Sequence, residues 1–226
     1  TTRKFLYGLR RARHVFCVSE DTKQCLQMLV PSLERVTVTN EGVVCPVDVP
    51  SWSQRLEQVL IFGTVEPRKN IPFLVELWPE VCRMLDRPVR LIVAGQDGWG
   101  NVVIETNATV ERRTNITDEA RDILFAQSRL VLVPSLHEGF GRVALEAMAQ
   151  GTPVIASCRG AHPEVMGDAG TLLDPMDRQA WIECVVQLLS DQVLWNHQQE
   201  MGRARAALFS WEEVATRILA VIAQNC

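Results

Sequence analysis

The chain has 226 residues, of which 47% are apolar and 22% are charged, a composition ordinary for a globular protein. Its net charge of −4 excludes the global positive field that attracts nucleic acid. The seven cysteines include no C-x-x-C pair, so the sequence predicts neither a zinc site nor a redox motif and favours a reducing compartment. No apolar run approaches the roughly 20 residues of a membrane span, and no signal peptide is recognisable. We therefore expect a cytoplasmic protein.

The first predicted element is a basic amphipathic helix at residues 3–13. Aromatic and aliphatic side chains alternate there with the cations Arg3, Lys4, Arg10, Arg11 and Arg13. Such a helix either packs its apolar side on its own protein, which is the commoner arrangement, or touches an anionic membrane surface. Peripheral association with the inner face of a membrane is therefore an open alternative.

Short β-branched runs then alternate with longer helical patterns. Strands are predicted at 14–18, 35–39, 58–63, 89–94, 129–133 and 153–157. Helices are predicted near 20–30, 70–86, 118–127, 142–150 and 178–190. This alternation predicts parallel βαβ units, and hence an α/β fold with a doubly wound, Rossmann-like parallel sheet. In such a sheet, ligands bind beyond the carboxyl ends of the strands.

The composition of residues 46–56, which include two prolines, is typical of a linker. It separates a βαβ fragment, residues 1–45, from a larger domain, residues 57–226. The fragment is too short to bury its own sheet, so we expect it to be the end of a larger domain. A final helix is predicted after Ser210, an N-cap with Glu213 three residues later, and its apolar face is expected to pack back toward the fragment.

The first candidate site follows the strand at 58–63. Gly63 there lets a ligand approach the backbone, and Pro67 suits the first turn of a helix. Arg68 and Lys69 then place two cations at a helix start, where they repel each other unless an anion is present. A diphosphate would supply that anion. The alternative interpretation is an exposed loop that is basic by chance.

The second candidate site, residues 134–149, leaves a strand, passes two glycines and enters a helix. Free N–H groups at such a helix start can cradle a phosphate or a sugar oxygen. Glu138 precedes the helix, and Glu146 lies in its second turn, where side chains lean toward the N-terminus. We therefore predict that both carboxylates bracket one anion-binding helix start and accept hydrogen bonds from sugar hydroxyls. The alternative is a turn residue and an exposed helix residue, which the apolar neighbours of Glu146 disfavour.

The run from Gly139 to Ala144 also matches the G-x-G-x-x-G/A dinucleotide fingerprint. Residues 134–138 separate the strand from the first glycine, however, and no acidic residue ends the next strand. Both features disfavour a dehydrogenase. A third loop at the same edge, residues 157–160, is predicted to have a structural role at least as readily as a binding role.

Together these stretches resemble the retaining glycosyltransferases of family 4, which have the two-lobed GT-B architecture. The resemblance rests on GTVEPRKN (63–70), on the E-x7-E element HEGFGRVALEAMAQGTPVIAS (137–157) and on AHPEVMGDAGTLLDP (161–175). Residues 14–43 resemble the last βαβ unit of the acceptor-binding N-terminal lobe of that family. Residues from about 55 onward resemble its donor-binding lobe.

The resemblance implies a role for each candidate residue. Arg68 and Lys69 would bind the donor diphosphate and stabilise the leaving group, and Glu138 would contact the transferred sugar. Glu146 would accept hydrogen bonds from the ribose. The implied donor-binding residues are Gly63, Thr64, Glu138, Gly139, Phe140, Gly141, Arg142 and Glu146. No metal or other cofactor is implied, and no protein nucleophile is evident.

The run LIVAGQDGW (91–99) resembles members that build mannose-containing bacterial surface polysaccharides such as lipopolysaccharide. It favours GDP-mannose over a UDP-linked hexose as the donor. Arg142 and Val143 depart from the leucine-proline pair often seen at this helix start, which changes the expected entry into the helix.

Because the acceptor lobe is largely absent from these residues, we expect nucleotide-sugar binding without transfer to a glycan or lipid-linked acceptor. We also expect residues 1–40 and the final helix to expose apolar surface that favours dimerisation. Two alternatives stay open: a non-catalytic nucleotide-binding or assembly module, and a sugar-nucleotide epimerase of the same two-lobed fold.

Overall fold

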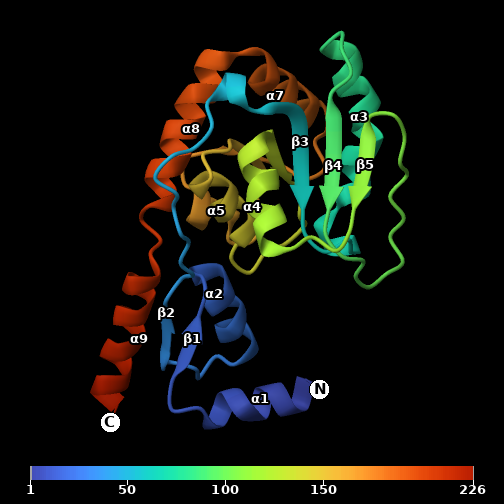
Figure 1. The fold of residues 1–226 in the computed structure, drawn as a ribbon. Coiled ribbons are helices and arrows are strands. Elements are labelled where there is room, and N and C mark those ends of the chain that lie inside the picture. The colour runs from blue at the N-terminus through green and yellow to red at the C-terminus, as the bar shows by residue number, and fades with distance from the viewer. Residues whose placement is uncertain (1, 226) are drawn as a thin grey trace.

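The computed structural model describes residues 2–225, which form a small unit and a large domain (Figure 1). In the small unit, strands β1 (Val15–Cys17) and β2 (Val36–Val38) pair in parallel around helix α2 (Glu20–Leu29). Helix α1 (Thr2–Arg11) lies against them through the buried Leu9 and the half-buried Leu6. The predicted basic helix therefore contacts its own protein through its aliphatic side chains.

The large domain holds six parallel strands in the order β5-β4-β3-β6-β7-β8. Their bounds are Leu56–Phe62 for β3, Arg90–Ala94 for β4, Val110–Arg113 for β5, Ser128–Val133 for β6, Val154–Ser157 for β7 and Thr171–Leu173 for β8. The chain builds outward from β3 in one direction and then from β6 in the other. The predicted doubly wound parallel sheet is therefore confirmed, and its order reverses between β3 and β6.

Helices cover both faces of this sheet. Alternate residues of its strands point to opposite sides, so each face is apolar and packs against its own set of helices. Val59 of β3 packs in the cluster of α3 (Ile71–Met84) and α7 (Arg178–Ser190), whereas Leu60 packs in that of α4 (Asp118–Gln127) and α5 (Arg142–Ala149). Short α6 (His162–Met166) and longer α8 (Gln192–Ala206) both contact α5. The carboxyl edge of the sheet stays uncovered by these helices and faces the small unit (Figure 1).

The last helix, α9 (Trp211–Asn225), returns to the side of the small unit (Figure 1). The side chain of Ser210 accepts the N–H of Glu213 at 3.1 Å, as the predicted N-cap requires. Where the chain crosses back, the N–H of Val43 donates to the carbonyl of Phe209 at 2.8 Å. The two segments that join the units therefore touch each other.

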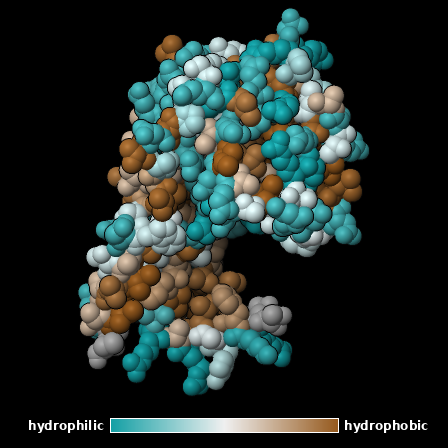
Figure 2. Space-filling view, viewed as in Figure 1, coloured by the Kyte–Doolittle hydropathy of each residue, from teal (hydrophilic) through white to brown (hydrophobic). Residues whose placement is uncertain are grey.

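Figure 2 shows hydrophobic side chains gathered over the small unit and α9, with a hollow between the two units. Exposed apolar residues there include Met28, Leu29, Leu219 and Ile222. The expected apolar surface is thus present, and dimerisation through it stays a prediction. None of the helices among residues 2–225 is long and apolar enough to cross a membrane.

Among the strands and α-helices of residues 2–225, β5, β8, α6 and α8 were not predicted, and neither was the 3-10 helix Trp52–Gln54 in the expected linker. β5 reads Val-Glu-Arg-Arg, and β8 has only three residues, because both are edge strands with one side open. α8 is mostly polar and buries only Trp195, Gly202 and Ala206. Such elements depend on the neighbours they pack against and carry little pattern of their own.

Candidate functional site

Two of the predicted site stretches meet at the carboxyl edge of the sheet, where the strand order reverses. One is the β3–α3 loop, residues 63–70, and the other is the β6–α5 loop, residues 134–141. The N–H of Leu136 donates to the carbonyl of Arg68 at 2.8 Å, and Nη1 of Arg68 donates to the carbonyl of His137 at 2.7 Å. The chain thus builds a single site from two distant motifs.

A cluster of charges occupies this meeting point. Nζ of Lys69 lies 2.5 Å from Oε1 of Glu138, and Nη1 of Arg68 lies 3.0 Å from its Oε2. Ser135 donates its hydroxyl to Oε1 of Glu138 at 2.7 Å, and Glu66 accepts from Nη2 of Arg68 at 2.6 Å. Burial opposes ionisation of Glu138, but Lys69, Ser135 and Arg68 outweigh it, so the pKa of Glu138 lies below its usual value. The carboxylate is therefore charged at neutral pH.

The expectation that Arg68 and Lys69 need a bound anion to offset their mutual repulsion is wrong in this structure. Glu66 and Glu138 provide two negative charges for the two cations, so the cluster is balanced. The local backbone also differs from the prediction: residues 67–69 form a separate 3-10 turn, and α3 begins only at Ile71. A diphosphate bound here would share the two cations with Glu138.

The β7–α6 loop, residues 158–161, packs against the β6–α5 loop within the large domain. The N–H of Ala161 donates to the carbonyl of Glu138 at 2.9 Å, and a Cβ at Gly160 would collide with the backbone of Glu138. Gly141 has φ of 97°, and a Cβ on it would lie 2.8 Å from the ring of the buried His162. The third predicted stretch therefore supports the backbone of the site.

The other predicted donor residues fall into two groups. Gly63 has φ of 136°, a backbone conformation that favours glycine, and lies beside the Lys69 side chain, while Thr64 next to it is exposed. Phe140 is instead buried, with its ring centroid 6.0 Å from that of Phe209. Its side chain contributes to packing, so only its backbone can face a ligand.

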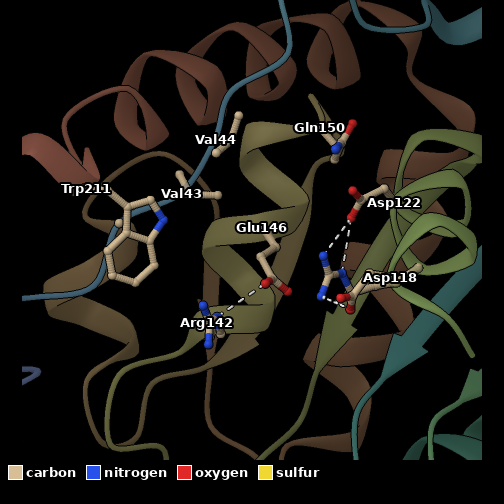
Figure 3. A pocket seen from close by; sticks show the side chains of 10 residues that line it. Val43, Val44, Asp118, Asp122, Arg142, Glu146, Gln150 and Trp211 are labelled. Atoms are coloured by element: carbon tan, nitrogen blue, oxygen red, sulfur yellow. Dashed lines mark hydrogen bonds and ion pairs between the residues drawn. The ribbon is translucent and has the colours of Figure 1, made fainter.

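Glu146 lies in a separate pocket of about 350 Å³ (Figure 3). The pocket is enclosed by α4, α5, the segment that joins the units, and the first residue of α9, and its lining includes Val43, Asp118, Arg121, Asp122, Arg142, Glu146 and Trp211. Oε1 of Glu146 lies 3.3 Å from Nε of Arg142, which is also 3.6 Å from Oε2 of Glu41. The two glutamates of the E-x7-E element therefore have different ion-pair partners, and Glu138 does not line this pocket.

We expect Glu146→Gln to raise the free energy of unfolding at pH 7. Burial raises the pKa of Glu146, and the cations Arg121 and Arg142 offset burial only in part. A carboxyl with a raised folded-state pKa does not lower the stability of the protein at a pH where it is protonated in both the folded and the unfolded state. It lowers the stability once the pH rises through the pKa of the unfolded chain, about 4.3. Urea unfolding should therefore show a more stable variant at pH 7 and no difference near about pH 3. Equal stability of the two proteins at pH 7 would contradict this.

A doubly wound sheet with a cluster of paired charges at its switch point defines a Rossmann-like domain. The chain belongs to the family described as Glycosyl transferases group 1, whose pattern matches residues 57–191. The resemblance to GT-B glycosyltransferases of family 4 is thereby confirmed.

Two relatives carry mannose in their names. The chain is 36% identical over 169 residues to the O-antigen chain mannosyltransferase B of Escherichia coli, covering 71% of this chain and 44% of that protein. It is 38% identical over 116 residues to the MMP alpha-(1->4)-mannosyltransferase of Mycolicibacterium hassiacum, covering 50% of this chain and 28% of that protein. The chain therefore spans less than half of these relatives.

Solved structures share the fold. Sucrose-phosphate synthase from Thermosynechococcus elongatus aligns with a TM-score of 0.75 at 25% identity, over 96% of this chain and 59% of that one. HepE from Anabaena, in complex with UDP-glucose, aligns with a TM-score of 0.81 at 20% identity, over 96% of this chain and 65% of that one. At this identity the second likeness concerns the fold alone.

Sequence reasoning missed several residues of the site. Glu66 and Ser135 lie inside the first and second candidate stretches, but the spacing of the sequence does not show that they contact Arg68 and Glu138. Arg121 and Trp211 line the Glu146 pocket from elements that are distant in sequence. Only the fold brings such residues together.

Proposed function

We propose that this chain is the donor-binding part of a retaining hexosyltransferase. The whole protein would transfer a hexose, specifically mannose, from a nucleotide-diphosphate sugar to a glycan or lipid-linked acceptor of a surface polysaccharide. The observation that carries the proposal is the contact of Lys69 and Arg68 with Glu138 at the switch point. It places cations for a diphosphate directly beside a carboxylate for sugar hydroxyls.

The proposal assigns each part of the donor to a group of residues. The diphosphate lies at Lys69 and Arg68, close to the start of α5, whose first N–H groups favour an anion. The hexose lies against Glu138, and the ribose lies in the pocket against Glu146. A donor in this position spans the β6–α5 loop and the first turns of α5.

Charge stabilisation is the chemistry that these residues can supply. Departure of the nucleoside diphosphate builds negative charge, which Lys69 and Arg68 would neutralise. Both oxygens of Glu138 are already engaged by Lys69, Arg68 and Ser135, which suits this carboxylate to orienting the sugar. The E-x7-E pair is therefore unlike the acid and nucleophile pair of a glycosidase.

Two observations support GDP-mannose as the donor. Both relatives described above are mannosyltransferases by name. The pocket beside Glu146 is also lined by the carboxylates of Asp118 and Asp122, each of which is paired with Arg121 through one oxygen and keeps the other for a ligand (Figure 3). A carboxylate accepts two N–H groups at once, and guanine offers an adjacent ring N–H and amino group, whereas uracil offers a single ring N–H in that position.

Calorimetric titration of this chain with GDP, UDP and ADP tests the proposal. We expect selective binding of GDP, and a loss of affinity of about tenfold or more in Glu146→Ala, because a hydrogen bond to a charged group is removed. Glu183→Ala, an exposed glutamate on α7 at the other face of the sheet, is the matched control and should bind normally. GDP binding that survives Glu146→Ala would refute the ribose placement. Failure of all three nucleotides to bind, here and in the full-length protein, would refute the donor-binding function.

A further inference from the structure

The N-terminus of α2 touches the β6–α5 loop across the boundary between the two units. The hydroxyl of Ser19, the N-cap of α2, donates to the carbonyl of Gly139 at 2.5 Å. The hydroxyl of Thr22 donates to the same carbonyl at 2.9 Å. Ser19 is fully buried, so this contact is shielded from water, where hydrogen bonds are strongest. A residue next to Glu138 is thus held by the small unit.

A second contact fixes α2 at this place. The carboxylate of Glu164 accepts the N–H of Glu20 at 2.9 Å through each oxygen and the N–H of Asp21 at 3.4 Å. A negative charge at a helix N-terminus is favourable, and it satisfies N–H groups that have no partner within the helix. Arg205 in turn donates to the carbonyls of Glu164 and Val165 at 2.6 and 2.9 Å. The anchor of α2 is therefore itself tied to α8.

The β6–α5 loop is consequently held from two sides. The N–H of Ala161 holds the carbonyl of Glu138 from the large domain, and Ser19 and Thr22 hold the carbonyl of Gly139 from the small unit. These two successive carbonyls set the peptide planes on both sides of Gly139. Glu138 precedes these planes, and the first N–H groups of α5 follow them. Loosening one side would let both drift from the place where a donor must lie.

We propose that Ser19 and Thr22, with α2 anchored by Glu164, are positioning residues for the donor site. They align Glu138 and the start of α5 with the hexose and diphosphate only while the small unit is docked. This role rests on the proposed donor-binding function. The small unit is then a component of the donor site. A shift of the small unit would change the position of the β6–α5 loop through the contacts of α2.

Thr22→Val is the sharpest test, because valine has the shape of threonine without its hydroxyl, and Thr22 does not cap the helix. We expect amide hydrogen exchange of Leu136 and Ala161, whose N–H groups hold the β6–α5 loop through the carbonyls of Arg68 and Glu138, to accelerate about fivefold, the effect of one lost hydrogen bond to this loop. Thr22→Ser should restore the protection. Lys23→Ala, which perturbs α2 without a bond to the loop, should leave these amides unchanged. Glu164→Ala should accelerate exchange in the loop and at the N–H groups of Glu20 and Asp21.

The same variants, titrated with GDP, separate this role from the donor-binding function. If Thr22→Val weakens GDP binding about fivefold while the urea midpoint falls by no more than one lost hydrogen bond accounts for, the positioning role is supported. Exchange and GDP affinity that both stay at the level of the unchanged protein would overturn it and leave the donor-binding function intact. Faster loop exchange in a protein that binds none of the nucleotides would support the contact and count against the donor-binding function. A general loss of stability with uniform exchange would also overturn the positioning role.

Discussion

Replacing Lys69 by alanine is expected to lower the rate of sugar transfer by the full-length protein about a hundredfold or more. Lys69 lies 2.5 Å from Glu138, in a half-buried cluster, and its charge sits where the leaving diphosphate would develop its own. Alanine removes this cation and leaves Glu138 with Arg68 and Ser135. Initial rates at saturating donor, measured beside nucleotide affinity, give the loss in the chemical step.

The same substitution should make transfer sensitive to acid. Burial favours the neutral form of Glu138, and Lys69 is the first of the groups that hold its pKa low against burial. Without Lys69 that pKa rises, so the remaining activity should fall at a higher pH than in the unchanged protein. Lys69→Arg keeps the charge and should retain more activity, while Arg83→Ala, an exposed cation on α3, should retain full activity. Loss of less than about half of the rate in Lys69→Ala would contradict the proposed role.

Arg55→Ala is expected to destabilise the protein by about 3–5 kcal/mol, the cost of removing a buried charged group from its partners. Arg55 is 3% exposed, and the donors of its guanidinium reach the carbonyls of Pro50, Phe125, Ser128, Gln150 and Gly151 and the hydroxyl of Thr152. Burial lowers the pKa of Arg55 to about 10, so it is still charged at neutral pH. Alanine would leave buried carbonyls without donors. Urea unfolding at pH 7 measures the loss.

Two variants complete that experiment. Arg55→Lys should also destabilise, because one ammonium cannot reach acceptors on both sides of a planar guanidinium. Arg178→Ala removes an exposed arginine at the start of α7 and should change the free energy of unfolding by less than about 0.5 kcal/mol. A change of less than about 1 kcal/mol in Arg55→Ala would show that water enters the site and replaces the guanidinium.

The central part of the fold was readable from the sequence. The predicted strands at 58–63, 89–94 and 129–133 lie within two residues of β3, β4 and β6, because parallel strands buried on both faces are continuous apolar runs. The edge strands β5 and β8 escaped prediction, since polar residues and short length are what an open edge favours. The burial of Arg55 was not predicted either, because it lies in a segment whose composition is typical of a linker.

For the site, the sequence by itself determined which residue types follow the strands: two cations after β3, and glutamates on either side of the start of α5. Strand endings and helix starts are local features, and local patterns predict them. Only the tertiary structure decided the pairing of Lys69 with Glu138, the separate pocket of Glu146 and the hold of Thr22 on Gly139. The Lys69–Glu138 and Thr22–Gly139 contacts join residues 69 and 117 positions apart, and their geometry depends on how the strands are ordered and how the two units dock.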